Sequence, residues 1–267
     1  MELDLEICRT IAIRYGLPLQ FVFKEFHLIE VISQIAALTV QKPDSLVFKG
    51  GTALNKAYLQ KTQRFSEDAD FDLVTTNASE ELSGFSKSLS SSLKGYRITN
   101  FRRVCTTMQF YCMYETPLGA EDHVRIDIAP KTLLTAKPVE TNQIVSEFTH
   151  SSISGMKMYS IEDLTARKMN ALATRAEGKD IYDVHMAFPM CSGDVLKTAV
   201  ELMLESEGSS ETVDSFIRRA VIRLKKSDPK KMRNLTNPFI PAANRPKSWE
   251  ELKNDLLAKL EDFENSI

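Results

Sequence analysis

The segment 68–73, which reads Asp-Ala-Asp-Phe-Asp-Leu, alternates acidic and apolar residues. In a β-strand this period of two places Asp68, Asp70 and Asp72 on one face and the apolar side chains on the other. Like charges at that spacing repel one another. A divalent cation such as Mg²⁺ or Mn²⁺, which prefers hard oxygen ligands, removes the repulsion. The pattern favours a metal site, with Asp68 and Asp70 as ligands and Asp72 as a structural or outer partner. The alternative is a polar edge strand without a metal.

A second segment, 124–128, alternates in the same way and carries Arg125 and Asp127 on the face opposite its apolar residues. If this strand neighbours the first, Asp127 completes a triad of metal-binding carboxylates with Asp68 and Asp70. An exposed aspartate on a half-buried strand fits the pattern equally well, so both interpretations stay open.

Upstream of the aspartates, Gly50 and Gly51 separate a short apolar run at 46–48 from a helix expected at 53–59, which Thr52 would cap. Glycines let the backbone approach a phosphate closely, and the amides at the start of a helix bind phosphate oxygens together with a threonine hydroxyl. The sequence therefore predicts a phosphate-binding site at this turn, unless the pair is only a turn. Three further polar residues are expected to contribute to it: Arg64, Ser66 and Lys56.

Lys168 lies on the apolar stripe of a helix expected at 161–175. A buried lysine is costly without a partner. It either extends to solvent or, as we prefer, reaches a bound triphosphate or serves as a general acid. Asp180 opens the next expected helix, where it is either a plain cap or the group that orients or neutralises Lys168 or Arg175. Asp183, one turn further on, is expected to be a structural partner.

The elements that must position these residues divide the chain into two halves. Residues 1–160 combine helices with short strands, and residues 161–267 read as helices only, apart from a loop expected at 228–247 because it holds four prolines. The predicted fold is α+β, a mixed sheet flanked by helices and followed by a helical C-terminal domain. The expected strands are 46–48, 68–73, 96–103, 106–114 and 123–129; the expected helices are an early one ending before Gly16, then about 20–40, 53–59, 79–93, 161–175, 180–188, 194–205, 211–225 and 249–263.

The overall charge leaves the class of partner open. A net charge of −2 and an isoelectric point near 6.2 give no general attraction to nucleic acid. Basic clusters nevertheless occur at 102–103, 218–226 and 230–233. They are either solvated helix faces and loops or a path toward an RNA end.

The four cysteines and four histidines show no paired metal spacing, which argues against a zinc site and favours reduced thiols in a cytoplasmic protein. The N-terminus has no basic region followed by an apolar run, and no stretch of the sequence is apolar enough to span a membrane. We therefore expect a cytoplasmic protein without a membrane partner.

As a set, these motifs resemble those of the AbiEii/AbiGii family of toxin nucleotidyltransferases, which belong to the DNA polymerase β-like superfamily. The likeness covers roughly residues 20–190. Its matching strings are Phe-Lys-Gly-Gly-Thr-Ala-Leu at 48–54, Arg-Phe-Ser-Glu-Asp-Ala-Asp-Phe-Asp at 64–72, Ile-Glu-Asp-Leu at 161–164 leading to Lys168, and Lys-Asp-Ile-Tyr-Asp at 179–183. In the last string Lys179 stands where the family usually has arginine.

The resemblance implies a polymerase β-like nucleotidyltransferase core with N-terminal helices in residues 1–160, and a helical domain, 161–267, that contributes to the active site. By the resemblance, four residues are catalytic: Asp68, Asp70, Lys168 and Asp180. It places the nucleotide at Gly51, Thr52 and Ser66. Asp127 matches the third metal-binding carboxylate only by its strand context.

The resemblance further implies a cytoplasmic bacterial toxin of a toxin–antitoxin or phage-defence system, with a cognate antitoxin as partner. Such an enzyme would use Mg²⁺ or Mn²⁺ to move a nucleotide from an NTP to an RNA 3′ hydroxyl, with tRNA as the expected acceptor. The same residues would serve nucleotidylation or phosphorylation of a protein hydroxyl. A non-catalytic nucleotide-binding regulator is a third possibility, which the three repelling carboxylates argue against.

Overall fold

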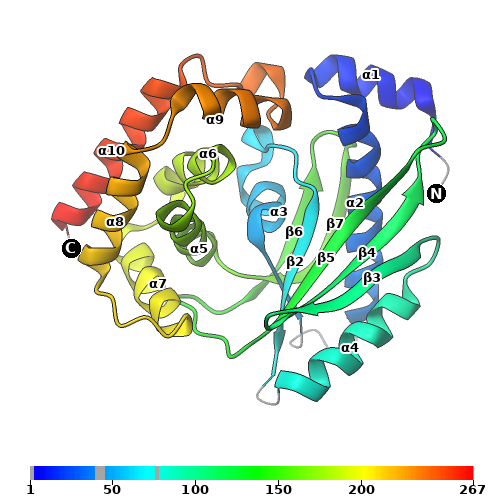
Figure 1. Cartoon of the computed structure of the whole chain (residues 1–267), viewed down its shortest axis with the longest axis horizontal. Helices are drawn as coiled ribbons and strands as arrows, with labels where there is room; N and C mark the ends of the chain where they lie inside the picture. Colours follow the sequence, from blue (N-terminus) through cyan, green and yellow to red (C-terminus); the bar gives the residue numbers. More distant parts are fainter. Residues whose placement is uncertain (1–2, 40–45, 76–77, 267) are drawn as a thin grey trace. The chain divides into compact units, whose positions relative to one another are not determined.

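The computed structural model describes residues 3–39, 46–75 and 78–266, and the chain forms two compact units (Figure 1). The first unit comprises residues 1–133 and 140–158, and the second comprises residues 134–139 and 159–267. All the described strands belong to the first unit, and the second is built from helices.

The first unit is built on a seven-stranded sheet with the strand order β3-β4-β5-β2-β1-β7-β6. At its centre β2 pairs parallel to β5 and antiparallel to β1, which itself runs parallel to β7. The predicted α+β fold with a mixed sheet is therefore confirmed. The strands are β1 (Leu46–Lys49), β2 (Asp68–Val74), β3 (Arg97–Val104), β4 (Thr107–Glu115), β5 (Glu121–Lys131), β6 (Glu140–Ser146) and β7 (Ser151–Met158).

Helices cover the sheet of this unit (Figure 1). The long helix α2 packs against β2, β5 and β7, and α4 packs against β4 and β5. Short helical turns connect β1 to β2, and these turns carry the glycine pair. The helices are α1 (Leu5–Tyr15), α2 (Leu19–Thr39), α3 (Gly50–Leu54) with its continuation as the π-helix η2 (Asn55–Leu59) and the 3-10 turn η3 (Gln60–Thr62), and α4 (Ala78–Ser92). Val40, placed in α2 by the sequence pattern, lies outside the described residues.

Two features of this unit differ from the sequence analysis. Strands β6 and β7 were not predicted. Their polar and small residues hide the alternation, and the register of the pair shifts between Asn142 and Ile144. The helix expected at 53–59 instead begins at Gly50, with Lys49 as its N-cap. Thr52 therefore lies inside the first turn and does not cap it.

The second unit is a bundle of helices around one apolar core. Its helices are α5 (Ile161–Thr174), α6 (Gly178–Ala187), α7 (Gly193–Ser206), α8 (Val213–Lys225), α9 (Pro229–Thr236) and α10 (Trp249–Ser266), with single 3-10 turns at Phe188–Met190, Asn237–Phe239 and Ala242–Asn244. The prediction of a loop throughout 228–247 is wrong at its start. Pro229 occupies the first turn of α9, where its missing amide costs nothing, and Asp228 caps the helix. None of the helices in the described residues is long and apolar enough to cross a membrane.

Candidate active site

The aspartate ladder is a strand, as its alternation predicts. In β2 the apolar residues Ala69 and Phe71 are fully buried, while Asp68 and Asp70 on the opposite face are partly exposed. The parallel neighbour β5 places Asp127 directly beside Asp70. Three carboxylates from two adjacent strands therefore share one face of the sheet.

Asp72 differs from the other two ladder aspartates because it is fully buried. Its carboxylate accepts a hydrogen bond of 2.5 Å from the ammonium of Lys49, at the end of the antiparallel neighbour β1. A buried carboxylate that is paired in this way ties β1 to β2. Asp72 is thus a partner of the strand that leads into the glycine turn.

Arg125 lies between two of the three remaining carboxylates. Its guanidinium donates to Asp68 Oδ2 at 2.6 Å, and its Nε lies 3.2 Å from Asp127 Oδ2. Gln109 of β4 adds a hydrogen bond of 2.9 Å to Asp127 Oδ1. The arginine therefore neutralises part of the negative charge that gathers on this face.

The charge of the Asp70 carboxylate is disfavoured by its surroundings. Burial raises its pKa to about 6, the neighbouring Lys49 lowers it, and the carboxylates of Asp127 and Asp68 raise it further. A carboxylate whose charge is disfavoured by burial and by like charges gains strongly from a bound cation.

The fit of this face to a metal ion rests on its chemistry. Three hard oxygen donors, Asp68, Asp70 and Asp127, match the ligand preference of Mg²⁺ and Mn²⁺. Within residues 3–39, 46–75 and 78–266, no three acidic, histidine or cysteine groups converge closely enough to hold a metal as they stand. Arg125 pairs with two of the three carboxylates.

The glycine turn lies directly against Asp70. Gly50 has a φ of +77°, and a Cβ atom built at this position would lie 2.3 Å from Asp70 Oδ2. Both the backbone conformation and the close approach therefore require glycine here. The turn and the aspartate form one local structure.

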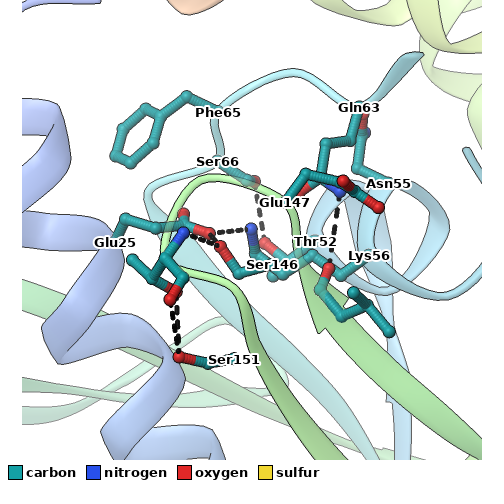
Figure 2. A network of polar contacts seen from close by, with 12 residues as sticks. Glu25, Thr52, Asn55, Lys56, Gln63, Phe65, Ser66, Ser146, Glu147 and Ser151 are labelled. Carbon is teal, nitrogen blue, oxygen red and sulfur yellow. Dashed lines mark hydrogen bonds and ion pairs between the residues drawn. The ribbon is translucent and has the colours of Figure 1, made fainter. Parts of the chain in front are cut away.

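Thr52 and Ser66 join this turn to the ladder strand, as Figure 2 shows in part. The buried Thr52 hydroxyl bonds the Ser66 hydroxyl at 2.7 Å and donates to the backbone carbonyl of Asp68. Asn55 adds a second link, because its side-chain oxygen accepts from the Arg64 amide at 2.8 Å. The hydroxyl pair expected to bind phosphate thus holds α3 against the start of β2.

The two cations expected near the turn lie in the interior. Lys56 is fully buried, and its ammonium donates to Glu25 of α2, which also accepts from Ser146 (Figure 2). The Arg64 guanidinium donates to the carbonyl of Phe65 at 2.9 Å, and its side chain is also buried. The Lys56 ammonium therefore has a carboxylate partner inside the protein.

The second unit brings Lys168 and Asp180 together. The Lys168 ammonium lies 3.1 Å from Asp180 and 2.9 Å from Asp183, and both carboxylates are fully buried. Arg175 donates to both oxygens of Asp180, at 2.7 and 3.0 Å. Burial alone would raise the pKa of Asp180, but Arg175 and Lys168 hold it below its usual value. Asp180 is therefore an anion that pairs with both neighbouring cations, and Asp183 supplies a second negative charge to Lys168.

Sequence reasoning gave no role to Lys49 and Arg125, and it treated Asp183 as structural only. A signal for Arg125 is its alternation with apolar residues, which places it on the polar face of β5, whereas Lys49 only ends an apolar run. Nothing in the sequence shows which carboxylates they contact, because that depends on the order of strands in the sheet.

Comparisons with known proteins agree with this fold. A family model described as "Nucleotidyl transferase AbiEii toxin, Type IV TA system" matches residues 35–266. The structure is similar to MenT4, a nucleotidyltransferase toxin from Mycobacterium tuberculosis H37Rv, with a TM-score of 0.69 and 17% identity over 98% of this chain and 90% of that one. It is also similar to JHP933 from Helicobacter pylori, with a TM-score of 0.55 and 19% identity over 94% of each chain.

At these identities the structural likenesses show a shared fold. No curated protein matches the chain. The family match, by contrast, spans most of the sequence and all the motifs described above. The chain therefore belongs to the AbiEii family of nucleotidyltransferase toxins of type IV toxin–antitoxin systems.

Proposed function

We propose that this protein transfers a nucleotide from an NTP to the 3′ hydroxyl of an RNA, with tRNA as the expected acceptor. The observation that carries the proposal is the set of three carboxylates, Asp68, Asp70 and Asp127, on adjacent strands beside the Gly50 turn. Membership of a nucleotidyltransferase family supplies the reaction class.

Asp68, Asp70 and Asp127 would hold Mg²⁺ or Mn²⁺, which would compete with the Arg125 guanidinium for these carboxylates. When bound, two such ions activate the attacking hydroxyl and balance the charge on the leaving pyrophosphate. The protein's own contribution is positioning and electrostatics, since phosphoryl-transfer chemistry requires little else.

The NTP would lie at the glycine turn. Gly50 and Gly51 offer backbone amides at the start of α3, and Thr52 and Ser66 offer hydroxyls next to the aspartates. Arg64 lies two residues before Ser66, and we expect it to stabilise the segment that carries the Ser66 hydroxyl. We assign Lys56 a supporting role in place of phosphate binding, because its ammonium is buried against Glu25.

We further propose that Lys168 and Asp180 take part in the same reaction. A lysine that is mostly buried yet held by two aspartates is a preorganised cation, suited to a triphosphate or to protonating the leaving group. Asp180 and Asp183 would fix its position, with Arg175 holding Asp180 in place.

Transfer of label from each of the four α-labelled NTPs, in the presence of Mg²⁺, to purified tRNA tests the proposal. We expect label on RNA that is lost on nuclease digestion. A labelled protein band that survives nuclease would instead identify a protein hydroxyl as the acceptor, and NTP binding without any transfer would indicate a regulator.

A type IV system also implies a cognate antitoxin, and protection from phage infection is a cellular role that such a pair could serve.

A further inference from the structure

A basic cavity lies within the helical unit, among the start of α6, the end of α8 and α9. Its volume is about 460 Å³, and it is lined by residues 175–179, 223, 226–228, 231–232 and 235–236. The lining carries two acidic residues, Glu177 and Asp228, and a larger set of cations: Arg175, Lys179, Arg223, Lys226 and Lys231. A protein with a net charge of −2 thus concentrates positive charge at one concave site.

The basic residues of α8 fall into two sets. Away from the cavity, three of them are already neutralised: Arg218 by Glu264 at 2.6 Å, Arg219 by Glu211 at 2.8 Å and Lys225 by Glu261 at 2.8 Å.

Three of the cations at the cavity differ from these in their pairing with carboxylates. Arg223, Lys226 and Lys231 are exposed, and none of them forms an ion pair with a carboxylate in the described part of the chain. Like charges that converge on one cavity without counter-ions favour an anionic ligand.

The cavity also has an apolar wall. Met232 and Ala176 line it, together with Leu235, whose side chain is 63% exposed and stands open to solvent. A cation-rich rim beside an apolar surface, in a volume typical of a small-ligand site, suits one nucleotide of a single strand, with its phosphate on the cations and its base on the apolar wall. An acidic peptide would use the charges but would leave this wall uncovered, so an RNA nucleotide fits the observations better.

The cavity is connected to the lysine–aspartate cluster through one shared residue. Arg175 lines the cavity and also donates to both oxygens of Asp180, which pairs with Lys168. We infer that this cavity binds a phosphate-bearing nucleotide of the acceptor RNA. The inference rests on the proposed RNA-directed function and assigns part of the acceptor site to α6, α8 and α9.

The test compares two triple variants of the full chain that remove the same charge. The cavity variant is Arg223→Gln, Lys226→Gln, Lys231→Gln, and the matched control is Arg218→Gln, Arg219→Gln, Lys225→Gln, whose side chains are paired elsewhere. Circular dichroism and thermal melting establish that both fold. Affinity for fluorescently labelled tRNA, its dependence on salt, and affinity for a fluorescent NTP analogue are then measured separately.

We expect the cavity variant to bind tRNA roughly tenfold or more weakly. Its affinity should also depend less steeply on salt, because with fewer phosphate contacts the binding of tRNA releases fewer counterions. The control variant should change much less, and NTP binding should be unchanged in both. Equal losses of tRNA affinity in the two variants would overturn the inference. A cavity variant that keeps its affinity for tRNA but loses affinity for the NTP analogue, or for an acidic partner protein, would overturn it as well.

Failure of the inference is distinguishable from failure of the proposed function. A cavity variant that binds and labels tRNA as the wild type does overturns the cavity assignment while RNA-directed transfer stands. A wild-type protein that neither binds nor labels any RNA overturns both.

Discussion

At the scale of single residues, Asp70 is where burial, charge and backbone geometry meet. Its pKa is raised to about 6 by burial and by neighbouring carboxylates, and Gly50 leaves just enough room for its side chain. The sequence identified both residues from the alternation of charges and from the glycine pair. It could not show that they touch, because their contact depends on how β1 and β2 pair.

The raised pKa of Asp70 predicts a dependence of stability on pH. Its value is 3.8 in a model peptide and about 6 in the folded protein, so the charged carboxylate costs the native state stability above pH 6. That cost falls as the pH decreases through 6 toward 3.8, because the native state then binds more protons than the unfolded chain. We predict that Asp70→Asn gains stability relative to the wild type at about pH 8, and that the gain shrinks steadily toward about pH 4.

Urea denaturation of both proteins in EDTA across this pH range measures the effect. EDTA is essential because a bound divalent cation would itself favour the charged carboxylate. A difference in the free energy of unfolding that does not change with pH would show that Asp70 has an ordinary pKa.

Gly50 allows a test with a matched control. Gly50 and Gly95 both have a positive φ, but only Gly50 has a neighbouring group where a Cβ would lie. Alanine at either position should cost about 1–2 kcal/mol for the left-handed backbone. We predict that Gly50→Ala also loses nucleotide transfer by displacing Asp70, while Gly95→Ala keeps it. Transfer rates measured at a temperature where both variants are folded decide this, and equal activity of the two would contradict the proposed geometry.

At the scale of elements, one buried network holds the turn-bearing helix in the first unit. Lys56 of η2 pairs with Glu25 of α2, which also accepts from Ser146 at the end of β6 (Figure 2). Three elements that are far apart in the sequence thereby meet at one carboxylate. Lys56 therefore helps to fix the position of the glycine turn, although its ammonium pairs with Glu25 and does not point to the turn.

Removing one partner of this network should be strongly destabilising. Lys56→Met leaves Glu25 charged and buried, so we predict a loss of about 3–5 kcal/mol in the free energy of unfolding. The double variant Glu25→Leu, Lys56→Met should recover much of that loss. As a control, Arg97→Gln breaks the exposed pair with Glu121 and should cost at most about 1 kcal/mol. Chemical denaturation measures all three, and a small effect of Lys56→Met would show that water or a rearrangement satisfies Glu25.

The elements that the sequence predicted best have strong periodicity. The ladder strand and the helices of the second unit are in this class, because their apolar residues recur at two or at three to four positions. Strands β6 and β7 were missed because their polar and small residues weaken the alternation, and because Gly155 in β7 has a φ of +88°. Helix α9 was missed because prolines suggested a loop, although Pro229 in the first turn is compatible with a helix.

At the scale of the whole molecule, the candidate residues are divided between two units. The carboxylates of β2 and β5 belong to the first, and the cluster of Lys168, Asp180 and Asp183 belongs to the second. The pattern of the sequence predicted both groups of residues separately. That both groups serve one reaction is our proposal, and experiment must test it.

Expression in bacteria without the antitoxin tests the role of the second group. We predict that the wild type arrests growth and that Lys168→Ala relieves the arrest, because the cation held by Asp180 and Asp183 is removed. Lys137→Ala is the matched control, since Lys137 of the same unit pairs with Glu162 at 2.8 Å and is about half exposed; it should stay toxic. Arrest by Lys168→Ala at equal protein levels would contradict a catalytic role.

The most direct test of the central claim is nucleotide transfer by Asp70→Asn compared with Asp122→Asn. Asp122 lies on the same strand as Asp127 but pairs with Lys24 at 3.0 Å, so its substitution removes a nearby carboxylate that the proposed site does not use. With Mg²⁺, NTP and the labelled acceptor, we predict a loss of about 100-fold or more for Asp70→Asn and a rate near that of the wild type for Asp122→Asn. Transfer by Asp70→Asn at the wild-type rate would contradict the assignment of the active site to this face of the sheet.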